Sequence, residues 1–234
     1  MERDQPATRS RETVTRKINT SPPGDLLLRL FAHFAFDSTT RTKAQPRAPR
    51  PKCYSEPVHE PMPTSEDQIR QDEIHRDLAR IALQEQELQF ASFTEDTAWQ
   101  LGTHLRELAA ARSLGIVIDV RRINQPLFYA AMPGTTPDNV EWVRRKINVT
   151  LRYHRSSYAI GLEMEQKNSN IYDRYGLPVA DYASHGGCFP IRAINAGLIG
   201  AVTVSGLPQR ADHELAVEAL CTIIGRDYET LLLP

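Results

Sequence analysis

Two pairs of short apolar segments constrain the fold of this 234-residue chain most strongly. The segments GIVIDVRR (residues 115–122) and QPLFYAAMP (residues 125–133) are rich in β-branched and aromatic residues and are joined by a short polar loop. A second pair lies at residues 189–194 and at LIGAVTVSG (residues 198–206), with a turn around Asn195 between them. Apolar segments joined by such short turns predict two β-hairpins and therefore an antiparallel sheet.

Helical patterns surround these strands. Sequences typical of capping boxes begin at Ser65 and Ser92, and Pro137 is suited to the first position of a third helix. The expected helices cover residues 65–84, 92–114, 136–158 (with an extension to 164 left open) and 212–224, and a short strand is expected at 88–93. Helices interleaved with hairpins predict an α+β fold, an antiparallel sheet flanked by helices.

The first 64 residues differ in composition from the rest. They hold nine of the sixteen prolines, one of the twelve glycines and an excess of Lys and Arg over Asp and Glu, whereas the remainder has an acidic excess. A basic, proline-rich segment buries too little apolar surface to offset its ordering entropy. The sequence therefore predicts a disordered extension at residues 1–64 and a single domain at residues 65–234, which is long enough to bury a core without disulfides.

Cysteine usage and hydropathy bear on the cellular compartment. Cys53, Cys188 and Cys221 are odd in number and show no framework spacing, which favours a reducing compartment. No segment approaches the roughly 20 apolar residues of a membrane span. We expect a cytoplasmic protein, with mitochondrial import as the alternative because the first residues are rich in Arg, Ser and Thr. The basic extension lacks interleaved aromatic residues, so no nucleic-acid partner is expected.

The helix predicted from residue 136 carries candidate binding residues. Apolar residues at spacings of three and four would place His154 and Tyr158 on the same face as Val143 and Ile147. His154 is then either a ligand at the mouth of a pocket or a half-buried histidine with one hydrogen bond. Arg152 and Arg155, on the adjacent face, would either bind an anionic ligand or lie in solvent or at a subunit interface.

The segment SHGGCFPIR (residues 184–192) contains the densest group of reactive atoms. His185 and Cys188 supply at most two ligands, too few for a structural zinc site, and no metal site is predicted. A cysteine–histidine nucleophilic pair requires a lowered thiol pKa that nothing in the sequence indicates. Gly186 and Gly187 permit a tight turn whose N–H groups bind an anion, or simply a turn into the next strand. We predict that this turn, with His185, forms a pocket wall.

Four segments together resemble one known family. They are PLFYAAMPGTTPDN, WVRRKINVTLRYHRSSY, RYGLPVADYASHGGCFPIR and GLIGAVTVSGLPQRADH. The chain is similar over residues 66–226 to the haem-degrading, or GlcG/PduO-like, domain family, and in particular to its uncharacterised cytosolic branch. The resemblance implies a profilin-like sheet flanked by helices, assembly into a homo-oligomer, and binding of a small molecule, with haem as the candidate cofactor.

The resemblance also implies an alternative role. Its eukaryotic branch is associated with cytosolic chaperones that deliver tail-anchored proteins to the endoplasmic reticulum. The apolar run Leu231, Leu232 and Leu233 would either dock on the protein itself or be presented to such a chaperone. No paired carboxylates, phosphate loop, metal quartet or hydrolase elbow names a reaction. The sequence therefore favours a binding protein over an enzyme, with His154, Arg155, Arg152, Tyr158, His185, Gly186 and Gly187 as the candidate ligand-binding residues.

Overall fold

The computed structural model describes residues 64–234, so the predicted extension lies outside the described residues except for Thr64. The helices are α1 (Ser65–Glu87), α2 (Glu95–Ala111), α3 (Pro137–Tyr153), α4 (Ser157–Gln166), α5 (Ile171–Tyr175), α6 (Gln209–Ile224) and α7 (Tyr228–Leu231). The strands are β1 (Gln89–Phe90), β2 (Val117–Arg122), β3 (Gln125–Ala131), β4 (Cys188–Ala193) and β5 (Gly197–Ser205). None of these helices is both long and apolar enough to cross a bilayer.

The five strands form one sheet in the order β1-β4-β5-β2-β3. The two predicted hairpins are confirmed as β2–β3 and β4–β5, and β5 pairs antiparallel with β2 to join them. β1 is the exception, because it runs parallel to β4. The expected strand at residues 88–93 is only two residues long, since Leu88 and Phe93 pack into the core instead of pairing. The sheet is therefore mixed rather than purely antiparallel.

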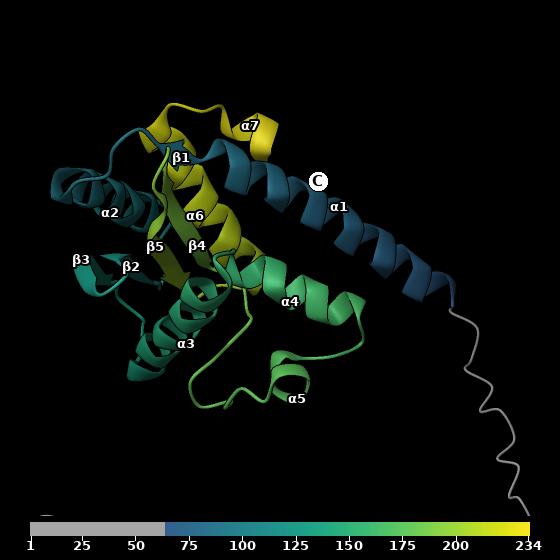
Figure 1. Ribbon diagram of the computed structural model, residues 1–234. Coiled ribbons are helices and arrows are strands. Elements are labelled where there is room, and N and C mark those ends of the chain that lie inside the picture. The colour runs from purple at the N-terminus through teal and green to yellow at the C-terminus, as the bar shows by residue number, and fades with distance from the viewer. Residues whose placement is uncertain (1–63) are drawn as a thin grey trace, which may run out of the picture. The chain divides into compact units, whose positions relative to one another are not determined.

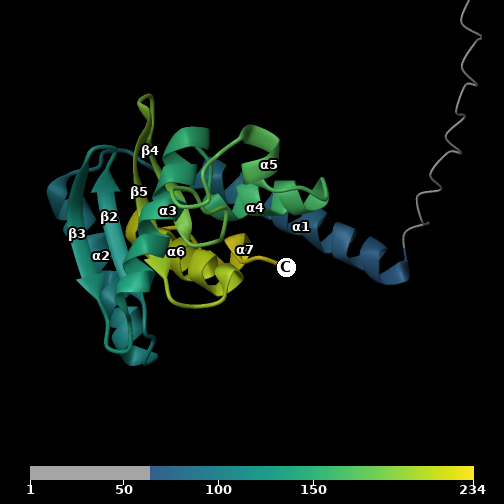
Figure 2. The ribbon, with the colours of Figure 1, turned by 90° about the horizontal axis from the view of Figure 1, so that it is seen from below.

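Helices cover both faces of this sheet, which confirms the predicted α+β class (Figures 1 and 2). Alternate residues of β2 show the two layers. Ile118 and Val120 join the larger core beneath α2 and α6, while Val117 packs with Val143 and Ile147 of α3 on the other face. Successive side chains of a strand point to opposite faces, so this alternation follows directly from the strand geometry.

The long helix predicted from residue 136 is interrupted near its C-terminal end, at residues 154–156. α3 ends at Tyr153 because His154 adopts a left-handed conformation, with φ 56° and ψ 32°. α4 then begins under an N-cap in which the Ser156 hydroxyl accepts a hydrogen bond from the Ala159 N–H at 3.2 Å. Serine is a preferred N-cap residue, and this local signal interrupts the apolar periodicity. His154 and Tyr158 therefore belong to different elements and do not share a helix face.

Helix caps and connectors also differ from the expected boundaries. Thr64 and Thr94, not Ser65 and Ser92, are the N-caps of α1 and α2, with capping boxes completed by Asp67 and Thr97. The connector after α4, expected to be irregular, contains the one-turn helix α5. These shifts of one or two residues are of the size usual at helix ends.

The C-terminal segment packs against α1 and α6. Leu231 and Leu233 are buried, each with 4% of its surface exposed. Three side chains of α1 and α6 bind main-chain oxygens of this segment: Arg80 that of Thr230, Gln84 that of Leu231 at 2.7 Å, and Arg210 that of Pro234 at 2.7 Å. Self-docking, one of the two outcomes expected for the leucine run, is what the structure shows.

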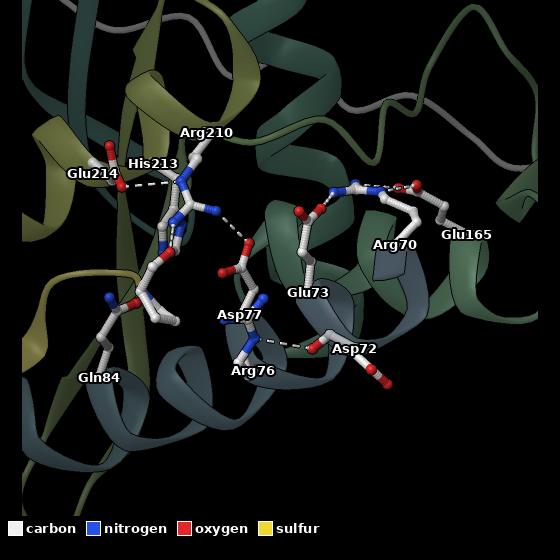
Figure 3. Close-up of polar contacts among 11 residues, drawn as sticks. Arg70, Asp72, Glu73, Arg76, Asp77, Gln84, Glu165, Arg210, His213 and Glu214 are labelled. Atoms are coloured by element: carbon white, nitrogen blue, oxygen red, sulfur yellow. Dashed lines mark hydrogen bonds and ion pairs between the residues drawn. The ribbon is translucent and has the colours of Figure 1, made fainter. Parts of the chain in front are cut away.

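Polar residues, some of them fully buried, hold the α1 and α6 side of this contact in place (Figure 3). Arg210 donates to Asp77 of α1 at 2.6 Å and to Glu214 of its own helix at 3.2 Å. Gln84, fully buried, contacts His213 Nε2 through its side-chain oxygen at 2.8 Å. His213 Nδ1 is buried without a partner among the described residues. Burial lowers the pKa of His213 to about 3, with a smaller contribution from the Arg210 charge.

This histidine predicts a pH dependence of stability. The unfolded chain binds a proton at His213 below about pH 6.5, whereas the folded chain does so only near pH 3. The free energy of unfolding therefore falls as the pH falls from 6.5 towards 3, by at most about 1.4 kcal/mol per pH unit from this one group. His213→Gln keeps a donor for Gln84 and removes the titration, so its unfolding free energy, measured by urea denaturation, should depend less steeply on pH. Equal slopes for the two proteins would contradict this assignment.

Candidate functional site

The glycine turn before β4 lies where α3, β5 and α6 meet. Gly187 has φ +121°, and a β-carbon there would stand 2.2 Å from the Val204 carbonyl oxygen. A β-carbon on Gly186 would stand 1.9 Å from the carbonyl oxygen of Gln209, at the start of α6. Both positions therefore need glycine, Gly187 for its backbone conformation and both for close backbone packing. The turn predicted from the sequence is present, and its glycines bring β4 against the start of α6.

Ser157 of α4 holds the two ends of this turn together. Its side chain is fully buried. The hydroxyl donates to the His185 carbonyl oxygen at 2.5 Å and accepts from the Cys188 N–H at 3.1 Å. One hydroxyl thus satisfies a buried main-chain acceptor and a buried donor across the turn, which fixes the position of His185.

A buried ion pair lies directly beneath the turn. Lys146 of α3 donates to Asp212 of α6 at 2.8 Å, and the two side chains are 4% and 2% exposed. Lys146 also donates to the Val204 carbonyl oxygen at 3.1 Å, while Asp212 accepts from the Leu207 N–H at 2.9 Å. Burial raises the pKa of Asp212, and the charge and hydrogen bond of Lys146 act against that rise. The pair connects one helix from each face of the sheet.

A pocket of about 250 Å³ opens over this pair. Its walls come from α3, from His185 just before the glycine turn, from the end of β5 and from the start of α6. The lining residues are Asp138, Asn139, Trp142, Lys146, His185, Ser205, Gly206, Leu207, Gln209 and Asp212. Asp138 accepts a hydrogen bond from the Trp142 indole at 3.1 Å, and Asp212 forms the ion pair with Lys146. Both carboxylates that line the pocket therefore have partners within the protein.

The pocket floor has hydrogen-bond donors to spare. A lysine ammonium carries three N–H groups, and two of those of Lys146 have acceptors in the protein. Ser205 is 3% exposed and lines the same pocket. α6 begins after Pro208 without a side-chain cap, and its first residue, Gln209, lines the pocket, so the uncapped start of the helix lies beside it. Such a set of donors suits an anionic group.

His185 stands at the rim of the pocket. Its ring packs edge-on against Trp142 with the ring centroids 4.9 Å apart. Partial burial lowers the pKa of His185, and the charges of Lys146 and Arg145 lower it further. The imidazole is therefore neutral at pH 7, the form that accepts a proton or ligates a metal. The Arg145 guanidinium lies 4.6 Å from the Trp142 ring centroid, and its Nε is buried without a hydrogen-bond partner among the described residues.

Of the seven predicted ligand-binding residues, only His185 lines this pocket, and Gly186 and Gly187 form the turn that follows it in the chain without lining the pocket themselves. The other four lie elsewhere. His154 is exposed beyond the far end of α3, and a helix rise of 1.5 Å per residue places Tyr153 about 16 Å along the axis from Trp142. Arg152 is exposed, with its guanidinium 5.8 Å from the Tyr182 ring centroid. Neither residue lines the pocket.

Arg155 and Tyr158 have structural partners away from the pocket. Arg155 forms ion pairs with Glu163 of α4 and, at 3.6 Å, with Glu85 of α1. Tyr158 is 3% exposed and packs against α1, with its ring 5.2 Å from that of His213. Arg155 is thus paired with carboxylates of its own chain, an outcome that neither of the alternatives expected from the sequence described.

Cys188 is fully buried on the α3 face of the sheet, whereas nucleophilic cysteines are partly exposed. The Thr203 hydroxyl donates to its sulfur at 3.1 Å, and burial raises the pKa of the thiol to about 11. Such a thiol stays protonated at neutral pH. Within residues 64–234, no group of three or more His, Cys, Asp and Glu side chains is placed to hold a metal ion.

Sequence reasoning missed Lys146, Asp212, Trp142 and Ser205 as site residues. Lys146 carried a usable signal, because it sits beside Val143 and Ile147 on the apolar face of its helix, where a lysine requires a partner. That partner lies 66 residues later in the chain, beyond what local periodicity reveals.

The ion pair predicts an asymmetric response to mutation. Lys146→Met leaves the Asp212 carboxylate buried without a counter-charge and should lower the free energy of unfolding by about 3–5 kcal/mol. In the double variant Lys146→Met/Asp212→Asn the buried charge is gone, and the side-chain oxygen still accepts from Leu207. Chemical denaturation should therefore show most of the loss recovered. A double variant as unstable as the single one would refute this account.

The turn predicts a second difference. Gly187→Ala combines an unfavourable backbone conformation, worth about 1–3 kcal/mol, with overpacking against Val204, worth about 1–3 kcal/mol more. Gly134 is the matched control, because it has φ +91° but open space around a β-carbon. Gly134→Ala should therefore show the backbone cost alone in thermal unfolding. Equal losses of stability in the two variants would contradict this prediction, because they would show that the close contact at Gly187 adds no cost of its own.

Comparison with known proteins places these features in a family. The family model described as haem degrading protein HbpS-like matches residues 93–221. A UPF0303 protein of Acidobacterium capsulatum is 61% identical over 158 residues, which cover 68% of this chain and 96% of that protein. A UPF0303 protein of Burkholderia thailandensis is 58% identical over 161 residues, covering 69% and 98%.

A solved structure shares the fold. The crystal structure of the Ybr137w protein aligns with a TM-score of 0.61 and 24% identity, over 70% of this chain and 98% of that chain. Together with the match to the family model, the sequence relatives confirm the resemblance seen in the sequence. The chain belongs to the HbpS-like family.

Proposed function

We propose that the domain binds a small molecule through a carboxylate group, in the pocket between α3, the glycine turn and α6. The observation that carries this proposal is the buried Lys146–Asp212 pair at the pocket floor, with one ammonium proton left for a ligand. A buried ion pair with a purely structural role would not need to lie at the floor of a pocket, whereas Lys146 does. Charged groups with shifted pKa values in a cleft are typical of functional sites.

The donors around the pocket support an anionic ligand over a cationic one. The spare Lys146 proton, the Ser205 hydroxyl and the uncapped start of α6 all offer hydrogen to an acceptor. Asp212 is compensated by Lys146, and Asp138 accepts from Trp142, so neither acid is free of a partner. A single carboxylate supplies enough negative charge and enough acceptor oxygens to match this set of donors.

Haem is the candidate ligand that the family description suggests. The residues fit part of it: a neutral imidazole at the rim, His185, for the iron, and the floor donors for one propionate. A volume of about 250 Å³ lies below the range of roughly 300–1,000 Å³ usual for drug-sized ligands, so one chain does not enclose the macrocycle. If haem were bound, His185 and the floor donors would hold it, and its iron would supply redox chemistry. We assign no reaction to the site.

The alternative role, contact with a chaperone through Leu231, Leu232 and Leu233, gains no support. Leu231 and Leu233 are buried against the protein itself, so a partner would first have to detach the segment. Assembly into a homo-oligomer remains part of our proposal. The cytoplasmic location and its mitochondrial alternative stay predictions from the sequence.

Titration with haemin tests the ligand proposal. The intact protein should give a saturable shift of the Soret band, and His185→Ala should weaken binding at least about tenfold, because iron coordination is lost. His154→Ala is the matched control: it removes an exposed histidine that does not line the pocket and should change nothing. A loss of binding in His154→Ala alone would favour the site first predicted from the sequence.

Metal-free protoporphyrin IX separates the two modes of recognition. Its carboxylates remain while the iron is absent, so its binding should survive His185→Ala. It should fall in Lys146→Met/Asp212→Asn, which removes the ammonium without leaving a buried charge. Quenching of tryptophan fluorescence, to which both Trp142 and Trp99 contribute, provides the measurement. A response that never saturates with either compound would refute the pocket as their binding site.

A further inference from the structure

β3 forms an open edge of the sheet. The strand order places it last, and it pairs with β2 along one side only (Figures 1 and 2). On its other side no strand of the described part of the chain pairs with it. The outward N–H and C=O groups of an edge strand are a template for another strand. The opposite edge of the sheet, β1, is only two residues long.

This edge lacks the usual protection against pairing. Natural edge strands carry charged residues, especially lysine, or proline, or are very short. β3 is seven residues long, and no charged residue occurs between Ile123 and Pro137. Pro126 is the one protective feature, and it lies next to the strand's first residue, beside the register shift in the β2–β3 pairing. The five residues from Leu127 to Ala131 remain available for main-chain pairing.

Exposed apolar side chains gather on both faces of this edge. On the α2 face, Trp99 is 64% exposed and contacts Phe128 of β3, with ring centroids 5.7 Å apart. On the α3 face, Tyr129 and Val140 are 48% and 41% exposed. With Ile123 in the β2–β3 turn, four of the nine large exposed apolar residues of the described chain lie on or beside β3. Such a concentration is typical of an interaction surface.

A hollow beside the edge offers room for a side chain from a partner. Its volume is about 240 Å³, and Tyr129, Val140 and Pro126 form its apolar rim. At its base, Asp119 and Arg121 form a two-bonded ion pair at 2.6 and 2.8 Å. This pair satisfies both groups within one chain. Arg144 also lines the hollow and pairs with Glu141 and Asp181, so the hollow contains no unpaired charge.

We propose that β3 of one copy pairs antiparallel with β3 of a second copy about a two-fold axis. The absence of charge makes the strand compatible with itself, because no like charges would face each other across the axis. A two-fold contact also repeats every feature of the edge, so Trp99, Tyr129 and Val140 of both copies become covered together. The two sheets join into one of ten strands. This inference rests on the oligomeric part of the proposed function and not on the ligand pocket.

Charged substitutions at the edge test the interface. Tyr129→Lys/Ala131→Lys places lysines at two exposed β3 positions, where two-fold pairing brings them near those of the partner. Light scattering and native mass spectrometry should show the full-length protein as a multiple of 26.4 kDa and should show the variant with a dimer dissociation constant raised at least about 100-fold. Val179→Lys is the control, since Val179 is 56% exposed and outside β3. It should leave the mass unchanged.

Two outcomes would overturn the proposal: a mass of one chain for the unaltered protein, or an unchanged assembly in the lysine variant. Hydrogen exchange provides an independent measurement. Amides of residues 127–131 should be protected in the assembled protein and should exchange at least about tenfold faster in the lysine variant, while those of β2 remain protected. Equal exchange in both proteins would also refute the interface. Haemin titration of the lysine variant separates the two proposals, because a lost interface with intact ligand binding leaves the pocket unaffected.

Discussion

The Lys146–Asp212 ion pair is the interaction on which the arrangement around the pocket depends. It connects α3 on one face of the sheet with α6 on the other, and the end of β5 passes between them. A buried ion pair is weak evidence for stability, because desolvation of two charges cancels much of their attraction. Its value here is geometric. The pair fixes where the pocket floor lies, and it does so only if the chain above it, at Gly187, has no side chain.

The pocket therefore depends on three elements distant in sequence, each of which must be placed correctly relative to the other two. The ammonium comes from a helix near the middle of the chain, the carboxylate from the last long helix, and the glycine turn from the segment between them. Ser157 adds a fourth constraint, because its hydroxyl closes the turn from α4. This arrangement positions His185 and Trp142 at the rim with little freedom. A rigid rim over a charged floor is the kind of preorganisation that ligand binding requires.

Local sequence patterns predicted much of the fold, but they did not identify Lys146, Asp212, Trp142 and Ser205 as residues of the candidate site. The hairpins β2–β3 and β4–β5 were predictable because β-branched residues alternate around short turns, and α2 and α6 because apolar residues recur with helical spacing. The break between α3 and α4 was not, since Ser156 competes with an apolar repeat that continues through it. The turn at Gly186 and Gly187 was predicted because paired glycines before a strand are a local signal, although the contacts that require glycine there come from Gln209 and Val204. Lys146 and Asp212 were not predicted as site residues, because each can be buried only with the other as its counter-charge, and the two lie 66 residues apart.

The anchoring of the C-terminal segment has a consequence for sequence variation. Arg80, Gln84 and Arg210 bind its main-chain oxygens, which every amino acid possesses. Only the alternating side chains of Leu231 and Leu233 enter the interior. Selection on this segment should thus act on two positions two residues apart, while Thr230 and Leu232 drift freely. The conserved feature would be a spacing of apolar residues, and the polar residues that maintain it would be found on α1 and α6 instead.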